Sequence, residues 1–137
     1  MIECDFFGKA ARFHHVGLGV RSIGALAPAM DCAPIMNNAE GVSLAFMDLN
    51  GVRIELLEPI GENSPIAASV RSGKKLLHLC YEVEDLDSAA ESYRLAGFHR
   101  LGPARQEPIF DDRKVVWVFN RHLGLFELIE RANKHTT

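Results

Sequence analysis

Two histidines and two glutamates recur at matched places in the sequence. His15 and His78 each begin a run of alternating apolar residues, and the two runs align with an offset of 63 residues. Glu55 and Glu127 each lie inside an apolar run, and those runs align with an offset of 72 residues. Two imidazoles and two carboxylates form a mixed nitrogen and oxygen donor set, which suits Mn, Fe, Co, Ni or Zn rather than Mg or Ca. The sequence therefore predicts one divalent metal site, with these four residues as its ligands.

Repetition distinguishes these residues from the other histidines. A single histidine on a strand is more often a packed residue than a ligand, but glutamate is rarely buried unless it is paired or bound to a metal. His14 has no counterpart in the second half, where Leu77 stands, and its side chain is expected on the face opposite to that of His15. We interpret it as structural. The remaining histidines are predicted at the surface: His99, His122 and His135.

The histidines must be positioned by two strands with similar patterns. Apolar residues alternate after each histidine, as in a strand with one packed face. The opposite faces carry small or polar residues around the histidine. The packed faces are Val16, Leu18 and Val20 in the first half, and Leu79, Tyr81 and Val83 in the second.

Each of these strands is followed by a helix signal. Asp85 is a good N-cap, and an apolar stripe from Leu86 to Tyr93 ends before Gly97, which suits the residue after a helix. The counterpart begins at Ser22, but Pro28 removes an N–H group inside the pattern. We therefore expect the first helix to be short or irregular.

Two hairpins complete the halves. Strand-like residues 42–49 and 52–58 are joined by Asn50-Gly51, a strong two-residue hairpin signal. Residues 114–120 and 125–130 repeat this hairpin with a longer turn. Glu58 and Glu130, three residues beyond the predicted ligands, are interpreted as solvated strand ends. Between the halves lies a connector in which Ser64 is able to cap a short helix.

Composition limits the class of protein. The chain has 137 residues, of which 47% are hydrophobic and 24% charged, which suits one compact soluble domain. No apolar run approaches the roughly 18 residues that span a bilayer, and the start does not resemble a signal peptide, so we expect a cytoplasmic protein without a membrane partner. A net charge of −3 argues against nucleic acid. Cys4, Cys32 and Cys80 are expected to be reduced thiols.

The residues resemble a known superfamily, the vicinal oxygen chelate proteins, which include glyoxalases, bleomycin resistance proteins and dioxygenases. The stretch 54–67, with the segment 77–85, is most similar to the methylmalonyl-CoA epimerase family within it. The resemblance covers residues 13–130 and implies an α+β fold, in which two βαβββ modules form a concave mixed β-sheet around a metal site. It implies one domain, with module 1 at about 13–58, a linker at about 59–75 and module 2 at about 76–130.

The resemblance also implies a function. By position, the family's ligands map onto His15, Glu55, His78 and Glu127. It implies a metal-dependent epimerase that transfers a proton at the carbon next to a carbonyl, with an acyl-CoA or another carbonyl compound as substrate, in a homodimer. Glu127 is the first candidate for the catalytic base and Glu55 the second. The third-strand carboxylate of some epimerases is missing here, and Leu44 stands in its place.

Three alternatives remain open. A glyoxalase I-like lactoylglutathione lyase, or a related small-molecule lyase, would use the same ligands. A non-catalytic small-molecule-binding protein would use the same cleft, although such relatives lack the ligand set. An extradiol dioxygenase would also use two histidines and a glutamate, but usually on a longer chain.

Overall fold

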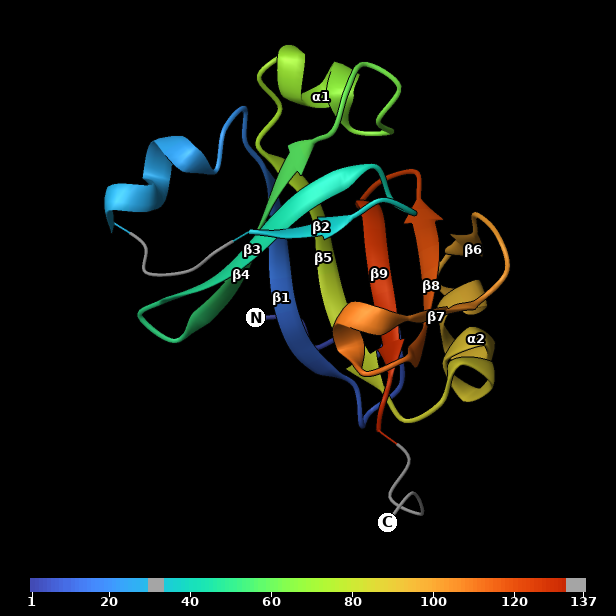
Figure 1. Cartoon of the computed structure of the whole chain (residues 1–137). Coiled ribbons are helices and arrows are strands. Elements are labelled where there is room, and N and C mark those ends of the chain that lie inside the picture. Colours follow the sequence, from blue (N-terminus) through green and yellow to red (C-terminus); the bar gives the residue numbers. More distant parts are fainter. Residues whose placement is uncertain (30–33, 133–137) are drawn as a thin grey trace. The chain divides into compact units, whose positions relative to one another are not determined.

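The computed structural model describes residues 1–29 and 34–132 (Figure 1). The chain divides into two compact units, which we describe separately. Unit 2 is the continuous segment 15–78, and unit 1 combines residues 1–14 with residues 79–137. The boundaries fall inside two strands, so each of these strands contributes residues to both units.

Unit 2 contains the first strand–helix–strand repeat. Its strands lie in the order β2-β3-β4-β1, with β1 parallel to β4 and the other pairs antiparallel (Figure 1). Asn50 and Gly51 both have left-handed backbone angles, φ 52° and 93°, as a tight two-residue hairpin requires. The predicted hairpin is therefore confirmed. The strands are β1 (Arg12–Gly19), β2 (Ile35–Asn37), β3 (Val42–Leu49) and β4 (Val52–Pro59).

The helical segments of unit 2 are short. The expected first helix is a 3₁₀ segment, η1 (Gly24–Ala29), and the Ser22 hydroxyl accepts a hydrogen bond from the Ala25 N–H at 3.2 Å. Helix α1 (Ala67–Arg71) follows β4 in the chain, with Ile66 at its N-cap and no side-chain cap. The expectation that Ser64 caps this helix is wrong, because the N-cap position is occupied by Ile66, two residues after Ser64.

Unit 1 repeats the same strand order. Strand β5 is parallel to β9, β9 is antiparallel to β8, and both β6 and β7 pair with β8. The predicted α+β organisation, with two strand–helix–three-strand modules, is confirmed, although the helical segment of the first module is 3₁₀ and the second strand of the second module is divided into two short pieces. The elements are β5 (Leu76–Val83), α2 (Leu86–Leu95), β6 (His99–Arg100), β7 (Arg105–Glu107), η2 (Pro108–Phe110), β8 (Arg113–Asn120) and β9 (Gly124–Glu130).

Helix α2 begins and ends as predicted. The Asp85 carboxylate accepts a hydrogen bond from the Ser88 N–H at 2.7 Å, and Gly97 follows the helix with φ 88°. The helix lies beside β8 and β9 within unit 1 (Figure 1). Ala89, Ala90 and Tyr93 bury its apolar stripe in the core of the unit.

The N-terminal segment belongs to this core, although sequence analysis assigned it no role. The buried Phe7 ring lies 5.0 Å from Phe98 and 5.5 Å from Phe126, measured between ring centroids. Arg131, just after β9, donates a hydrogen bond to the Ala10 carbonyl. Residues outside the two predicted modules therefore complete unit 1.

Glu58 and Glu130 are not solvated strand ends, as the sequence suggested. Each is half-buried, and each accepts a hydrogen bond from a backbone N–H at the start of the helical segment that follows β1 or β5. The Ile23 N–H donates to Glu58 at 2.7 Å, and the Leu86 N–H donates to Glu130 at 3.2 Å. The two halves thus repeat a hydrogen bond in which a glutamate side chain accepts from a backbone N–H at the start of a helical segment, which otherwise lacks a partner within that segment.

Other expectations concern cysteines and membrane spans. Cys4 is an exposed free thiol and Cys80 a buried one, whereas Cys32 lies outside the described residues. Across residues 1–29 and 34–132, none of the helices is long and apolar enough to cross a membrane.

Candidate metal centre

Three of the four predicted ligands meet inside unit 2. His15 on β1, Glu55 on β4 and His78 on β5 are 0%, 4% and 4% exposed. The two histidine Nε2 atoms lie 3.1 Å apart, and Glu55 Oε1 lies 3.3 Å from the first and 3.5 Å from the second. We call these three residues the donor cluster.

Strand pairing and a glycine position the donor cluster. The parallel register places Gly17 opposite Glu55, two residues after His15 on the same face. A Cβ atom on Gly17 would lie 2.2 Å from Cε1 and 2.4 Å from Nδ1 of His78. Glycine at this position therefore leaves the space that the His78 ring fills.

The donor cluster stabilises the ionised form of its carboxyl group. Burial alone raises the pKa of Glu55, but hydrogen bonds to His15 and His78, and the charges of these two residues, lower it from 4.5 to about 2. Two imidazoles thus face a carboxylate that stays charged throughout the neutral range. A buried charge needs such partners, because desolvation is costly.

The donor cluster fits a divalent metal ion. Each residue offers a ligand atom, and these atoms converge within 4.8 Å of one another. Ligands bound about 2.1 Å from one ion lie roughly 3.0–3.4 Å apart in octahedral and tetrahedral arrangements. The observed separations of 3.1–3.5 Å match this spacing, and two imidazoles with one carboxylate are donors typical of a transition metal.

Glu127, the fourth predicted ligand, belongs to unit 1. It lies on β9, is 4% exposed, and pairs across the ladder with Trp117 of β8. Its register partner on β5 is Cys80, the residue that aligns with Gly17 in the repeat. Glu127 therefore corresponds to Glu55 in its strand pairing as well as in the sequence repeat. The roles of Glu127 as metal ligand and as base stay predictions.

The third strand of unit 2 carries apolar side chains beside the donor cluster. Leu44 is buried opposite Leu57, and Phe46 lies opposite Glu55 with its ring 5.6 Å from that of His15 at 82°. Asp48 is an exposed carboxyl of this strand, at the hairpin end opposite Arg53. Sequence reasoning noted Leu44 but missed Phe46, which only the strand register could have indicated.

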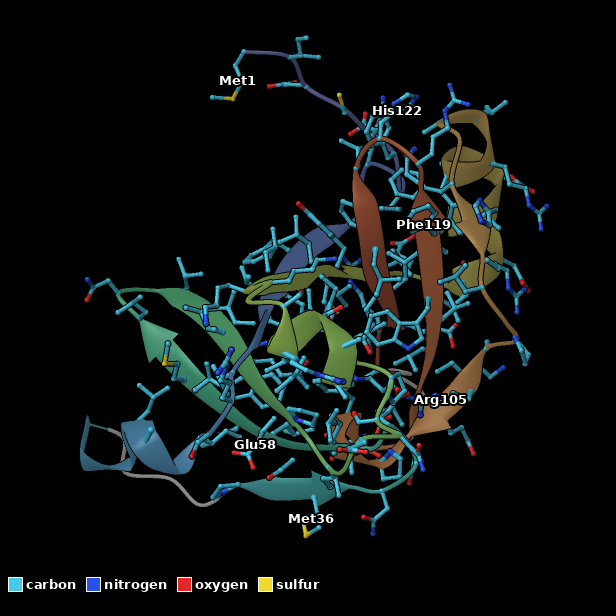
Figure 2. The ribbon with its side chains drawn as sticks, turned by 90° about the horizontal axis from the view of Figure 1, so that it is seen from above. Met1, Met36, Glu58, Arg105, Phe119 and His122 are labelled. Atoms are coloured by element: carbon cyan, nitrogen blue, oxygen red, sulfur yellow. The ribbon has the colours of Figure 1, made fainter. Side chains whose placement is uncertain are left out.

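The remaining histidines are not members of the donor cluster. His14 packs edge-on against Phe110 with ring centroids 5.5 Å apart, which agrees with a structural role. His99 is exposed on β6, and His122 is exposed in the turn between β8 and β9 (Figure 2). His135 lies outside the described residues.

An ion-pair cluster in unit 1 also escaped sequence analysis. Glu82 accepts hydrogen bonds from Arg113 at 2.8 Å and from Arg131 at 3.2 Å. Partial burial raises the pKa of Glu82, but the two guanidinium groups outweigh it, so the pKa lies below its usual value. The partners are distant in sequence, and no local pattern links them.

Comparison with known proteins places the chain in a family. A model of the Glyoxalase/Bleomycin resistance protein/Dioxygenase superfamily matches residues 14–117. An ethylmalonyl-CoA/methylmalonyl-CoA epimerase of Cereibacter sphaeroides is 36% identical over 100 residues, which cover 66% of this chain and 75% of that protein. A human mitochondrial methylmalonyl-CoA epimerase is 34% identical over 83 residues, covering 59% of this chain and 42% of the human protein. The matched region is thus less than half of the human protein.

Solved structures share the fold. The methylmalonyl-CoA epimerase of Mycobacterium tuberculosis has a TM-score of 0.75 at 20% identity, covering 98% of this chain and 95% of that chain. A Streptomyces coelicolor methylmalonyl-CoA epimerase variant in complex with 2-nitronate-propionyl-CoA has a TM-score of 0.71 at 20% identity, covering 89% and 98%. With this fold and the superfamily match over most of its length, the chain belongs to the glyoxalase/bleomycin resistance protein/dioxygenase superfamily, as an epimerase-like member.

Proposed function

We propose that the protein is a divalent-metal-dependent epimerase that inverts the carbon next to the thioester carbonyl of methylmalonyl-CoA or a close alkylmalonyl-CoA. The buried donor cluster of His15, Glu55 and His78 carries this proposal, because its donor types and spacing fit a metal ion. The epimerase relative of Cereibacter sphaeroides, named for ethylmalonyl-CoA and methylmalonyl-CoA, supports the choice of substrate.

The proposed ligands are the donor cluster and Glu127. The internal repeat supports the fourth ligand, because Glu127 has the same strand position in its unit as Glu55 has in the other. When bound by these residues, a divalent cation would supply Lewis-acid chemistry, which stabilises negative charge that develops on a carbonyl oxygen. The donor types favour Mn, Fe, Co, Ni or Zn.

Glu127 is the proposed base. It accepts the proton from the substrate C2 atom, and the electron pair of the broken C–H bond passes into the enolate. Glu55 is the second candidate, but its Oε1 atom already faces both imidazoles of the donor cluster. Water, or a group outside the four ligands, returns a proton to the opposite face of C2, so the reaction has no net change in atoms or electrons.

The proposal treats residues 13–130 as one functional domain, with modules at about 13–58 and 76–130 and a linker at about 59–75. We place the enzyme in the cytoplasm as a homodimer. The free thiols of Cys4 and Cys80 are compatible with a reducing compartment. Light scattering on the purified protein tests the dimer: the mass of two chains is expected, and the mass of one chain contradicts it.

Deuterium exchange tests the activity. The metal-loaded protein is incubated with methylmalonyl-CoA in deuterated water, and mass spectrometry follows the label at C2. We expect deuterium to enter C2, exchange to stop after metal removal, and exchange to return when Co²⁺ is added. A metal-loaded protein that leaves C2 unlabelled refutes the proposal, and conversion of a glutathione hemithioacetal would then favour the glyoxalase-like lyase.

A further inference from the structure

An aromatic residue stands beside each glutamate of the repeat. In unit 2, Phe46 of β3 is the antiparallel partner of Glu55 of β4. In unit 1, Trp117 of β8 is the antiparallel partner of Glu127 of β9. Residues directly opposite in such a ladder point to the same face, with Cβ atoms about 4.5–5.5 Å apart. Each unit by itself therefore places an aromatic side chain next to its carboxylate.

Phe46 also contacts the donor cluster. Its ring lies 5.6 Å from the His15 ring in an edge-to-face arrangement, measured between centroids. Leu44 and Leu57, which share this face, are buried, whereas Phe46 is only half-buried. Of these three apolar side chains, Phe46 thus combines contact with a ligand histidine and surface that a substrate can touch.

The surroundings of Phe46 suit a hydrocarbon group. The next pair on the same face, Asp48 and Arg53, is exposed and lies two residues further along the strands, about 6.8 Å away. The Phe46 ring itself offers no hydrogen-bond donor to a carboxylate or carbonyl, so burying such a group against the ring is unfavourable. An alkyl group gains from the same contact, because it removes apolar surface from water.

We propose that Phe46 is a specificity-determining residue that limits the size of the alkyl substituent on the epimerised carbon. This inference rests on the proposed function and assigns one part of the substrate to one side chain. The flat ring is rigid and lies next to the metal-binding histidine, so a larger substituent at C2 meets it first. Trp117 takes the corresponding place in unit 1, beside Glu127, so it is the comparison residue.

A comparison of two substrates that differ by one methylene group tests the proposal. The ratio of kcat/KM for ethylmalonyl-CoA to that for methylmalonyl-CoA is measured by C2 deuterium exchange for wild type and Phe46→Ala, with metal content determined in parallel. We expect this ratio to rise about tenfold or more in Phe46→Ala, because one methylene group in an apolar pocket changes the ratio of kcat/KM values by at least about tenfold. Phe46→Trp, which enlarges the side chain, is expected to lower the ratio.

Two further variants make the result specific. Phe6→Ala is a matched control, because the Phe6 ring packs on Phe98 in the core of unit 1 and is not part of the site; its ratio is expected to equal that of wild type. Phe46→Leu keeps an apolar side chain in case the alanine variant does not fold, and a smaller rise in the ratio is expected.

The outcomes separate this inference from the proposed function. A wild type that exchanges neither thioester refutes the proposed function itself. An active wild type whose ratio is unchanged in Phe46→Ala and Phe46→Leu overturns only the role of Phe46. The role is also overturned if Phe46→Ala loses metal without a change in the ratio, because Phe46 would then act only by supporting His15. It is likewise overturned if Trp117→Phe changes the ratio and the Phe46 variants do not.

Discussion

Gly17 and His78 fill complementary space in unit 2: a Cβ atom on Gly17 would lie 2.2 Å from Cε1 of the His78 ring. No real side chain tolerates such a contact, so any residue larger than glycine must displace the imidazole. Gly17 is also the strand partner of Glu55. One glycine thus allows a histidine and a carboxylate from different strands to approach each other.

Gly17→Ala is therefore expected to weaken metal binding at least tenfold. Mutation of residues that orient metal ligands typically lowers metal affinity by about 10–100-fold. Competition with a chromophoric chelator gives the dissociation constant. Gly102→Ala is the control, because a Cβ atom there would meet nothing within 4 Å. Unchanged affinity in Gly17→Ala would show that the His78 ring moves aside without loss.

His78→Ala is expected to reduce the metal content from about one ion per chain to nearly none, because the remaining donors cannot replace a buried imidazole. Elemental analysis of purified protein measures the content. His122→Ala, in the exposed turn between β8 and β9 (Figure 2), is the control and is expected to keep its metal. Full occupancy in His78→Ala would refute the ligand assignment.

Glu127→Gln is expected to lower the rate of C2 exchange by a factor of about 10²–10⁴, as for the loss of a general base. The amide keeps an oxygen donor of the same shape, so substrate binding is expected to change far less. Glu130→Gln is a matched control on the same strand, because Glu130 accepts a hydrogen bond from the Leu86 N–H and has no proposed part in the chemistry. Exchange at the wild-type rate in Glu127→Gln would exclude Glu127 as base.

Glu82→Gln is expected to lower the free energy of unfolding by about 1 kcal/mol or less near pH 7, since the pairs with Arg113 and Arg131 are partly exposed. The pKa of Glu82 is lowered in the folded state, so its contribution to stability is complete above the ordinary value of 4.5 and disappears as the pH falls through the lower folded value. Urea titrations between pH 3 and pH 7 measure the difference from wild type. Glu84→Gln, at an exposed carboxylate 3.7 Å from Arg131, is the control. A difference that grows towards acidic pH would contradict this account.

Much of the fold was predictable because it rests on local rules. Alternating apolar residues indicated β1 and β5, the Asn50-Gly51 pair fixed the hairpin between β3 and β4, and Asp85 marked the start of α2. These signals lie within a few residues of the structure that they specify. The repeat added the pairing of His15 with His78, since duplicated halves place equivalent residues at equivalent strand positions.

The sequence by itself determined which residues can bind a metal and which strands carry them. Only the tertiary structure decided that His15, Glu55 and His78 meet with ligand atoms 3.1–3.5 Å apart, that Gly17 provides the space, and that Phe46 flanks the carboxylate. It also assigned Glu58 and Glu130 to backbone N–H groups 35 and 44 residues away in the chain. The physical reason is that such contacts depend on strand register and on side-chain volume between distant segments, which no local pattern encodes.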